Sequence, residues 1–422
     1  MLKDHYDEKD KTFIREFFLS FCESRGYYIE PQSPIISKEQ DETVVFIGSS
    51  TNIFKKYLLR EEPFTDPGIS LYQEKIRTQN YKNFYSAPSE FSSFFEGGGV
   101  LTPVHRYQDL LKETIDFLSE GVGVHLDNLA IDVASSSKEF DIVNEVAKKK
   151  GVDLIVDKKP SSYYEWKFGV PGIFGHGIIF SIKRFGQAPN GEFGTLVMIS
   201  DERSENIAVE WGFGTETLLS KLYGYRHPIS CSLISKIYPY EIEEKDINFC
   251  DIITTCLVIL DELLCEERKP ESARTVLRRY LSALKFYVRE SELPDAELKK
   301  IIDYLCNQKF KKNKDTGQWL TDYLKRARKL ENRFVKGMKG LVETNPTSVL
   351  DIKTVEKQLK KKQSINVFQL AELYGYTNLP DSKFFSTIKD AVDMNGNIKK
   401  NYYKKLLKAK NKKSSYKKAK KI

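Results

Sequence analysis

The stretch Val209–Gly224, with the sequence VEWGFGTETLLSKLYG, decides the fold class of this 422-residue chain. Its first residues are typical of a β-strand, a Gly-x-Gly turn follows, and helix-forming residues run on to Gly224. Glycines let a backbone approach a ligand closely, and the amides that begin a helix are unpaired donors that favour anions. The pattern predicts a strand, turn and helix suited to a nucleotide, although a purely structural turn would have the same pattern.

Three upstream segments precede this stretch in a definite order. Phe13–Gly26 predicts a helix whose apolar residues Phe13, Phe17, Phe18 and Phe21 share one buried face and which ends at a glycine. A second segment, residues 70–80, predicts a strand that carries Arg77 and leads into a polar loop. A third, residues 92–97, predicts a return strand that carries Phe95 and Glu96. The Gly-x-Gly-x-Glu stretch then completes the order.

This order of helix, arginine strand, Phe-Glu strand and Gly-x-Gly-x-Glu resembles the catalytic core of the class II aminoacyl-tRNA synthetases, specifically alanyl-tRNA synthetase. Later segments extend the resemblance over most of the chain. They are Tyr164–Gly172, similar to the family segment whose tryptophan walls the amino-acid pocket; Glu271–Tyr280, similar to a helix of the tRNA-recognition domain; and Val367–Tyr376, similar to a segment near the end of that domain. The resemblance implies an α+β fold with a class II synthetase-like antiparallel sheet and flanking helices, followed by an all-α domain.

The secondary-structure pattern and the distribution of charge along the chain predict three parts. Residues 1–240 mix short β-type runs with helices, and they carry 27 Lys and Arg against 34 Asp and Glu, a net charge of −7. Residues 241–422 carry 40 against 25, a net charge of +15. We therefore expect a catalytic domain over 1–240, a helical RNA-recognition-like domain over 241–400 and a lysine-rich flexible tail over 401–422. Surplus lysines that merely keep a helical domain soluble would give the same asymmetry.

Composition narrows the cellular setting and the metal chemistry. The six cysteines form no Cys-x-x-Cys pair, so we expect no zinc site and no disulfide framework. The charged N-terminus has no apolar targeting core, and no apolar run reaches membrane length. These features predict a cytoplasmic protein without a membrane partner.

The resemblance implies that the chain joins a small amino acid to ATP as an aminoacyl-adenylate and passes it to tRNA or a tRNA-like acceptor. Negative charge builds on the α-phosphate during the first step, and a fixed guanidinium is its natural stabiliser. The residues that match the family's ATP site, with Arg77 and Glu96 as the catalytic pair and Mg²⁺ expected with the nucleotide, are Arg77, Phe95, Glu96, Gly212, Gly214 and Glu216. Those that match the amino-acid pocket are Trp166, Thr195 and Glu210, of which Glu210 would pair with the ammonium group.

The chain departs from the family at two ATP-tail contacts. Thr217 stands where the family has an arginine, and Phe91 stands where it has a histidine or arginine. Losing one charged contact to a phosphate costs about 1.5–3 kcal/mol. If the chain is an enzyme, Lys221 is a candidate for the missing cation, because it lies four residues on along the same helix face.

Residues that would contact RNA also match in part. They are Arg274, Arg278, Arg279 and Glu372, with Pro270 and Glu372 replacing two family residues that read the alanine mark on tRNA. The arginines would contact phosphates, or they would be ordinary charges on a helix surface. Two further functions stay open: an adenylate-forming ligase with a non-tRNA acceptor, and a catalytically degenerate paralogue that acts as an RNA-binding or regulatory module.

Overall fold

The computed structural model describes residues 7–37, 44–63, 66–84, 87–168, 172–183, 191–265, 270–290, 293–309 and 313–329. The chain forms two compact units. The first combines the residues up to Thr78 with Glu90–Ile242, and the second combines Gln79–Ser89 with the described chain from Glu243 onward. A short segment of the N-terminal half therefore belongs to the same unit as the C-terminal helices.

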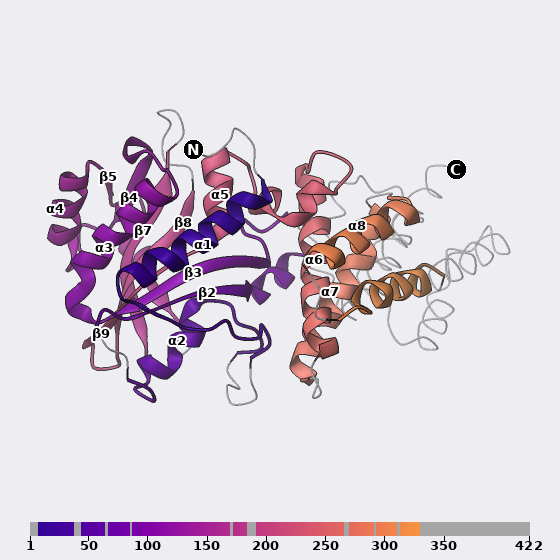
Figure 1. The fold of residues 1–422 in the computed structure, drawn as a ribbon, viewed down its shortest axis with the longest axis horizontal. Helices are drawn as coiled ribbons and strands as arrows, with labels where there is room; N and C mark the ends of the chain where they lie inside the picture. The colour runs from indigo at the N-terminus through magenta and orange to yellow at the C-terminus, as the bar shows by residue number, and fades with distance from the viewer. Residues whose placement is uncertain are drawn as a thin grey trace, which may run out of the picture. The chain divides into compact units, whose positions relative to one another are not determined.

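The first unit is built on a nine-stranded sheet (Figure 1). Its order is β1-β2-β3-β9-β8-β7-β4-β5, and β6 pairs with β7. The β1–β2 and β4–β5 pairs are parallel, and the other pairs are antiparallel. The strands are β1 Tyr28–Ile29, β2 Ile69–Ile76, β3 Phe94–Thr102, β4 Leu129–Val133, β5 Asp153–Val156, β6 Glu165–Lys167, β7 Phe174–Ile182, β8 Glu192–Ser200 and β9 Asn206–Phe213.

The stretch that decides the fold has the predicted local structure. Strand β9 ends at Phe213, Gly214 is the N-cap of the next helix, and Gly224 ends that helix with a φ of 69°. A positive φ favours glycine, which explains why the helix stops there. The helices of this unit are α1 Glu8–Ser24, α2 Ser50–Leu58, α3 Tyr107–Asp116, α4 Phe140–Lys150 and α5 Thr215–Tyr223.

Helix α1 begins earlier than its apolar pattern predicts. Asp7 caps it, and a reciprocal capping box joins Asp7 to Asp10. Phe18 and Phe21 are buried as predicted, but Phe13 is 47% exposed, so its assignment to the buried face is wrong. The ring of Phe13 instead stacks on Phe17 at a centroid distance of 5.9 Å.

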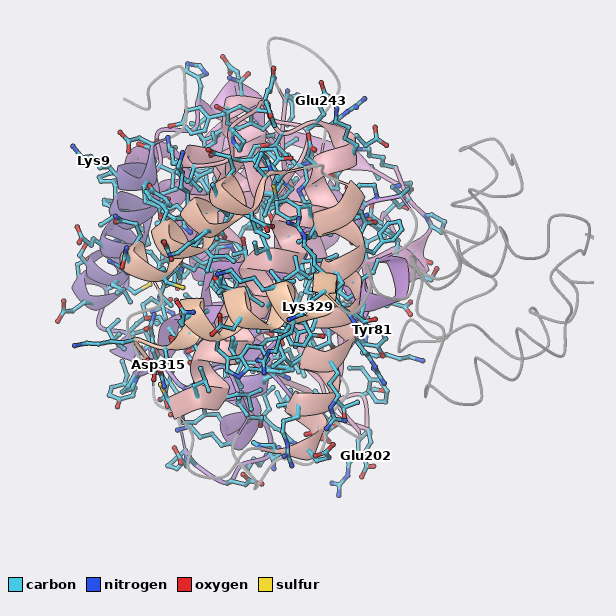
Figure 2. All side chains as sticks on the ribbon, turned by 90° about the vertical axis from the view of Figure 1, so that its right-hand side faces the viewer. Lys9, Tyr81, Glu202, Glu243, Asp315 and Lys329 are labelled. Carbon is cyan, nitrogen blue, oxygen red and sulfur yellow. The ribbon has the colours of Figure 1, made fainter. Side chains whose placement is uncertain are left out.

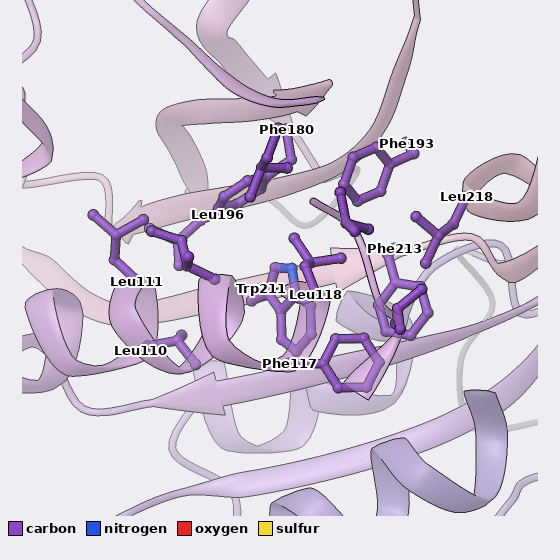
Figure 3. Close-up of a cluster of buried hydrophobic side chains, with 14 of the residues drawn as sticks. Leu110, Leu111, Phe117, Leu118, Phe180, Phe193, Leu196, Trp211, Phe213 and Leu218 are labelled. Carbon is purple, nitrogen blue, oxygen red and sulfur yellow. The ribbon is translucent and has the colours of Figure 1, made fainter. Parts of the chain in front are cut away.

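Apolar side chains cover both faces of the sheet. The larger cluster includes Phe117 and Trp211 (Figure 3) as well as Phe18. The ring of Trp211 lies 5.3 Å from that of Phe117 and 5.7 Å from that of Phe18. A smaller cluster on the other face joins Phe54 of α2 to β-strand residues such as Val197. Burial of aromatic side chains on this scale stabilises the packing of α1, and of the turn that follows α3, against the sheet.

The second unit is helical. Its helices are α6 Glu244–Cys265, α7 Glu271–Glu290 and α8 Asp295–Gln308, and residues 316–329 are also helical. The segment Gln79–Ser89 is anchored on α7, because the ring of Phe84 lies 4.6 Å from that of Tyr280 and the Tyr287 hydroxyl donates to the Phe84 carbonyl at 2.5 Å.

These observations confirm the predicted α+β fold with a following helical part. The expected continuation of the helical domain to residue 400, the Val367–Tyr376 segment, Glu372 and the tail over 401–422 lie outside the described residues.

Candidate functional site

Two helices cover opposite faces of β3. A Cβ atom on Gly98 would lie 2.8 Å from the Phe18 ring of α1, whereas one on Gly99 would lie 2.1 Å from the Ser50 hydroxyl of α2. Successive strand residues point to opposite sides, so these two glycines define an α1 face and an α2 face of the sheet. Any larger residue at either position would push a helix away from the strand.

Arg77 lies on the α2 face in contact with two aromatic rings. Its guanidinium carbon is 4.5 Å from the ring centroid of Phe91 and 4.5 Å from that of Phe95. Its backbone amide donates to the Ser93 carbonyl at 2.7 Å, which fixes the end of β2 against the return strand. Burial lowers the pKa of Arg77 to about 10, so the side chain remains charged at neutral pH. The stacked planar group is pre-oriented for bidentate binding of an oxyanion.

The structure thus brings Arg77 and Phe95 together, as the sequence predicts. It also gives Phe91 a contact that the sequence does not suggest, since Phe91 supplies the second ring against the guanidinium. Thr217 lies nearby: a Cβ on Gly214 would be 3.2 Å from the Thr217 hydroxyl and 3.4 Å from the Phe95 ring. Lys221, the candidate replacement cation, lies instead against Gly191, the residue before β8.

Lys75 is a site residue that sequence reasoning missed. It is 3% exposed and donates to the Ser50 hydroxyl at 2.9 Å. Burial lowers its pKa to about 7, an effect opposed mainly by the charge of Glu210. Its position two residues before Arg77, which directly follows β2, was the available signal, because a period of two in extended chain puts both side chains on one face.

Glu210 lies on the same face, on β9. It is 7% exposed, and its Oε2 accepts a hydrogen bond from the Thr51 hydroxyl at 2.7 Å. Burial raises its pKa to about 7, and the Thr51 hydrogen bond and then the charge of Lys75 oppose the rise. Ser50 and Thr51, the first two residues of α2, therefore hold one buried charge each.

The other predicted amino-acid residues, Thr195 and Trp166, and the predicted nucleotide residue Gly212 lie on the same sheet face as Glu210. Gly212 follows it by two residues on β9, so it faces the same side, and Thr195 is its neighbour on β8. A Cβ on Gly212 would meet only the Gly98 carbonyl, at 3.8 Å, so the sheet surface beside Glu210 is open there. Trp166 is partly buried against the apolar cluster of the α2 face.

Glu96 and Glu216 lie on the α1 face and bind a lysine instead. The Lys11 ammonium is 3.2 Å from Glu96 Oε1 and 2.7 Å from Glu216 Oε1, and Glu216 Oε2 accepts the Glu96 backbone amide at 2.9 Å. All three side chains are buried. Glu96 and Glu216 are therefore engaged by Lys11 on the α1 face, whereas Arg77 and Phe95 contact each other on the α2 face.

The described residues provide no preformed metal site. No group of three or more His, Cys, Asp or Glu side chains in that part of the chain is arranged to hold an ion. Within the same residues, no helix is long and apolar enough to cross a membrane.

The predicted RNA-contacting arginines of α7 already have partners. Glu271 binds Arg274 at 2.7 Å and Arg278 at 2.7 Å, and these contacts, that of Arg278 first, lower the pKa of Glu271. The guanidinium of Arg279 lies 4.7 Å from the ring of Tyr81, a residue labelled in Figure 2. Arg274 and Arg278 form exposed ion pairs, which exchange readily with other anions.

No protein-family model matches the chain. The alanine–tRNA ligase of Latilactobacillus sakei is 26% identical over 128 residues, which is 30% of this chain. Those of Listeria innocua and Levilactobacillus brevis are 28% identical over 99 residues and 30% identical over 76 residues, or 21% and 18% of the chain. Over part of its length, this chain is similar to the alanine–tRNA ligases, at 26–30% identity.

The matched region is a small part of each relative's length. It spans 14% of the Latilactobacillus sakei ligase, 11% of the Listeria innocua ligase and 8% of the Levilactobacillus brevis ligase. Among solved structures, the RNA-binding domain of a Cryptosporidium parvum threonyl-tRNA synthetase is 11% identical with a TM-score of 0.36, covering 51% of this chain and 64% of that one. Histidyl-tRNA synthetase from S. aureus is 10% identical with a TM-score of 0.35, covering 53% and 73%.

Proposed function

We propose that the chain activates a small amino acid with ATP and transfers the acyl group to tRNA or a related acceptor. The observation that carries this proposal is the position of the Arg77 guanidinium over the rings of Phe91 and Phe95, on the same sheet face as Lys75 and Glu210. A fixed guanidinium beside two buried opposite charges suits a reaction between a phosphoanhydride and a small charged acid.

In the proposed first step, a carboxylate oxygen of the amino acid bonds to the α-phosphorus of ATP, and the bond to the pyrophosphate oxygen breaks. Arg77 would bind the α-phosphate oxygens, and Phe95 would stack on the base. Gly212 and Gly214 would let the nucleotide approach the backbone. Mg²⁺ would arrive on the phosphates of ATP and neutralise their charge.

The amino acid would lie beside β8 and β9. Glu210 would bind its ammonium group, with Thr195 and Trp166 beside it. We leave Glu96 and Glu216 out of the proposed nucleotide contacts because both carboxylates bind Lys11. Their proposed part is indirect, since Glu216 accepts the backbone amide of the residue that follows Phe95.

Amino-acid-dependent ATP–pyrophosphate exchange tests this proposal. The full chain is incubated with ATP, Mg²⁺ and labelled pyrophosphate, and each small amino acid is added in turn. One of them should stimulate incorporation of label into ATP, because adenylate formation is reversible. If no amino acid stimulates exchange while the protein is folded, the proposed activity is wrong.

The proposed acceptor contact is α7 of the helical unit. Glu271 now forms ion pairs with both Arg274 and Arg278. An RNA phosphate that binds either arginine would replace Glu271 as its partner. Glu271→Gln should therefore tighten tRNA binding in a filter assay and steepen its salt dependence, because more phosphate contacts release more counterions. The matched control is Glu297→Gln on α8, which removes a similar exposed ion pair with Lys300. Equal affinities for all three proteins would exclude α7 as the RNA-binding face.

A further inference from the structure

Lys75 and Glu210 are opposite charges that are buried together without forming an ion pair. Each shifts the ionisation of the other. Within the described part of the chain, however, the Lys75 nitrogen does not come within the 4.0 Å of an ion pair from either Glu210 oxygen. Instead, Lys75 donates to Ser50 and Glu210 accepts from Thr51. The hydroxyls of two adjacent α2 residues are therefore the partners of Lys75 and Glu210, in place of a direct contact between the two charged groups.

This arrangement leaves binding capacity unused. An ammonium group has three donors and a carboxylate can accept about four hydrogen bonds, whereas each of these groups has one neutral hydroxyl partner. Charges as buried as these are normally paired with another charge. Burial shifts both pKa values to about 7, which is the response expected of charges that lack a full partner.

The sheet surface between the two groups is made of glycine. Lys75 pairs with Phe95 across the strands, and Glu210 pairs with Leu101, so β3 lies between them. Ser50 lies over Gly99 in the middle of that stretch, and the surface above Gly212 is open. Because Ser50 fills the space over Gly99, a small molecule would lie above Gly212, beside Glu210 and beside the Ser50 hydroxyl to which Lys75 donates.

We infer that Lys75 and Glu210 bind the two ends of one small zwitterion, with its carboxylate on Lys75 and its ammonium on Glu210. The inference rests on the proposed function, because the zwitterion would be the amino acid that is activated, and it adds Lys75 as the residue that selects a free carboxylate. A dicarboxylate or a phosphate would be repelled by Glu210, and a diamine by Lys75. Only a ligand with one charge of each sign satisfies both groups.

The positions of these residues along the strands predict the orientation of the bound zwitterion. Lys75 lies two residues before Arg77 on the same face, and its ammonium is 5.9 Å from the centroid of the Phe95 ring that Arg77 also contacts. Glu210 is at the other end of the glycine surface. A zwitterion bound in this way would turn its carboxylate toward Arg77, and the carboxylate is the group that attacks the phosphate in the proposed reaction.

Calorimetric binding to the full chain without ATP tests the inference. The zwitterions are L-alanine, glycine and L-serine, and the single-charge analogues of alanine are L-alaninamide, which keeps the ammonium, and propionate, which keeps the carboxylate. We expect one or more zwitterions to bind, and alanine to bind at least tenfold more tightly than both analogues. Lys75→Gln should weaken alanine at least tenfold and leave alaninamide unchanged, whereas Glu210→Gln should weaken alanine and leave propionate unchanged.

Lys149→Gln is the matched control, since Lys149 forms an exposed ion pair on α4 and its loss should change no affinity. Unchanged binding of the single-charge analogue shows in each variant that the site is still folded. The inference is overturned if no zwitterion binds, if propionate or alaninamide binds as tightly as alanine, or if Lys75→Gln keeps wild-type affinity. Zwitterion binding without any pyrophosphate exchange would overturn the proposed activity alone, because these titrations contain no ATP.

Discussion

Buried charged side chains on the two faces of β3 differ in their partners. On the α1 face, Lys11 touches both Glu96 and Glu216, so the cluster is closed. On the α2 face, Lys75 and Glu210 are held apart by Ser50 and Thr51, so each charge can accept another partner. A closed cluster serves to hold elements together, whereas separated charges are suited to a ligand.

The closed cluster joins three elements that are distant in sequence. Lys11 comes from α1, Glu96 from β3 and Glu216 from α5. A second contact from Tyr223 of α5 to Asp10 of α1, at 2.7 Å, strengthens the same junction. The α1 face therefore supports the strand whose opposite side carries Phe95, and the comparison separates residues that support the site from residues that form it.

The largest expected effect comes from opening the closed cluster. Lys11→Met leaves two buried carboxylates without their shared ammonium, and breaking a buried ion pair in this way costs about 3–5 kcal/mol. The free energy of unfolding in urea should fall by that amount. Lys9→Met, two residues away at an exposed position, should change it by less than about 0.5 kcal/mol. A loss below about 1 kcal/mol in Lys11→Met would show that the cluster does not hold the fold.

A smaller effect is expected in the pH dependence of stability on the α2 face. The pKa of Lys75 is lowered from 10.5 to about 7, so between these values the folded protein binds fewer protons than the unfolded chain. Its contribution to the free energy of unfolding therefore rises with pH, by about 2 kcal/mol between pH 7 and pH 9. Lys75→Met removes that rise, and the stability of the wild type relative to this variant should grow across the interval. Parallel pH profiles for the two proteins would contradict the assigned burial of Lys75.

The smallest effect is expected for the hydroxyl partner of Glu210. Thr51→Val keeps the shape of the side chain but removes its hydrogen bond, at a cost of about 1 kcal/mol. The loss should be larger at pH 8, where Glu210 is ionised, than at pH 5, which lies below its pKa of about 7. Thr12→Val on the exposed side of α1 is the control for the threonine-to-valine change. A loss that does not depend on pH would mean that Thr51 contributes only through packing.

Much of the fold could be predicted because its signals are local. The strand, glycine turn and helix over Val209–Gly224 follow from neighbouring residues, and the structure has them there. Phe13 was misassigned because its apolar spacing fits the helix, while its exposure depends on how α1 packs. The membership of Gln79–Ser89 in the helical unit has no local signal, since it depends on Phe84 meeting Tyr280 almost 200 residues later.

The candidate site also contains residues whose neighbours could be predicted from the sequence and residues whose neighbours could not. Arg77 and Phe95 could be predicted as neighbours because Phe95 pairs with Lys75 on the adjacent strand, two residues before Arg77. The partners of Glu96 and Glu216 could not, because Lys11 lies in a charged run typical of a surface helix and is 85 and 205 residues away from them. Charge alone does not reveal which face of a strand a side chain will occupy.

The central claim is that the α2 face of β3 carries the chemistry and the α1 face supports it. Amino-acid-dependent ATP–pyrophosphate exchange by Arg77→Ala and Tyr223→Phe tests it most directly, since each variant alters one face. Arg77→Ala should lose at least ~3 kcal/mol of transition-state stabilisation, or more than about a hundredfold in rate. Tyr223→Phe removes only the hydroxyl that bonds Asp10 and should stay within about threefold of the wild type. Retention of exchange within tenfold by Arg77→Ala, or an equal loss in both variants, would contradict the account.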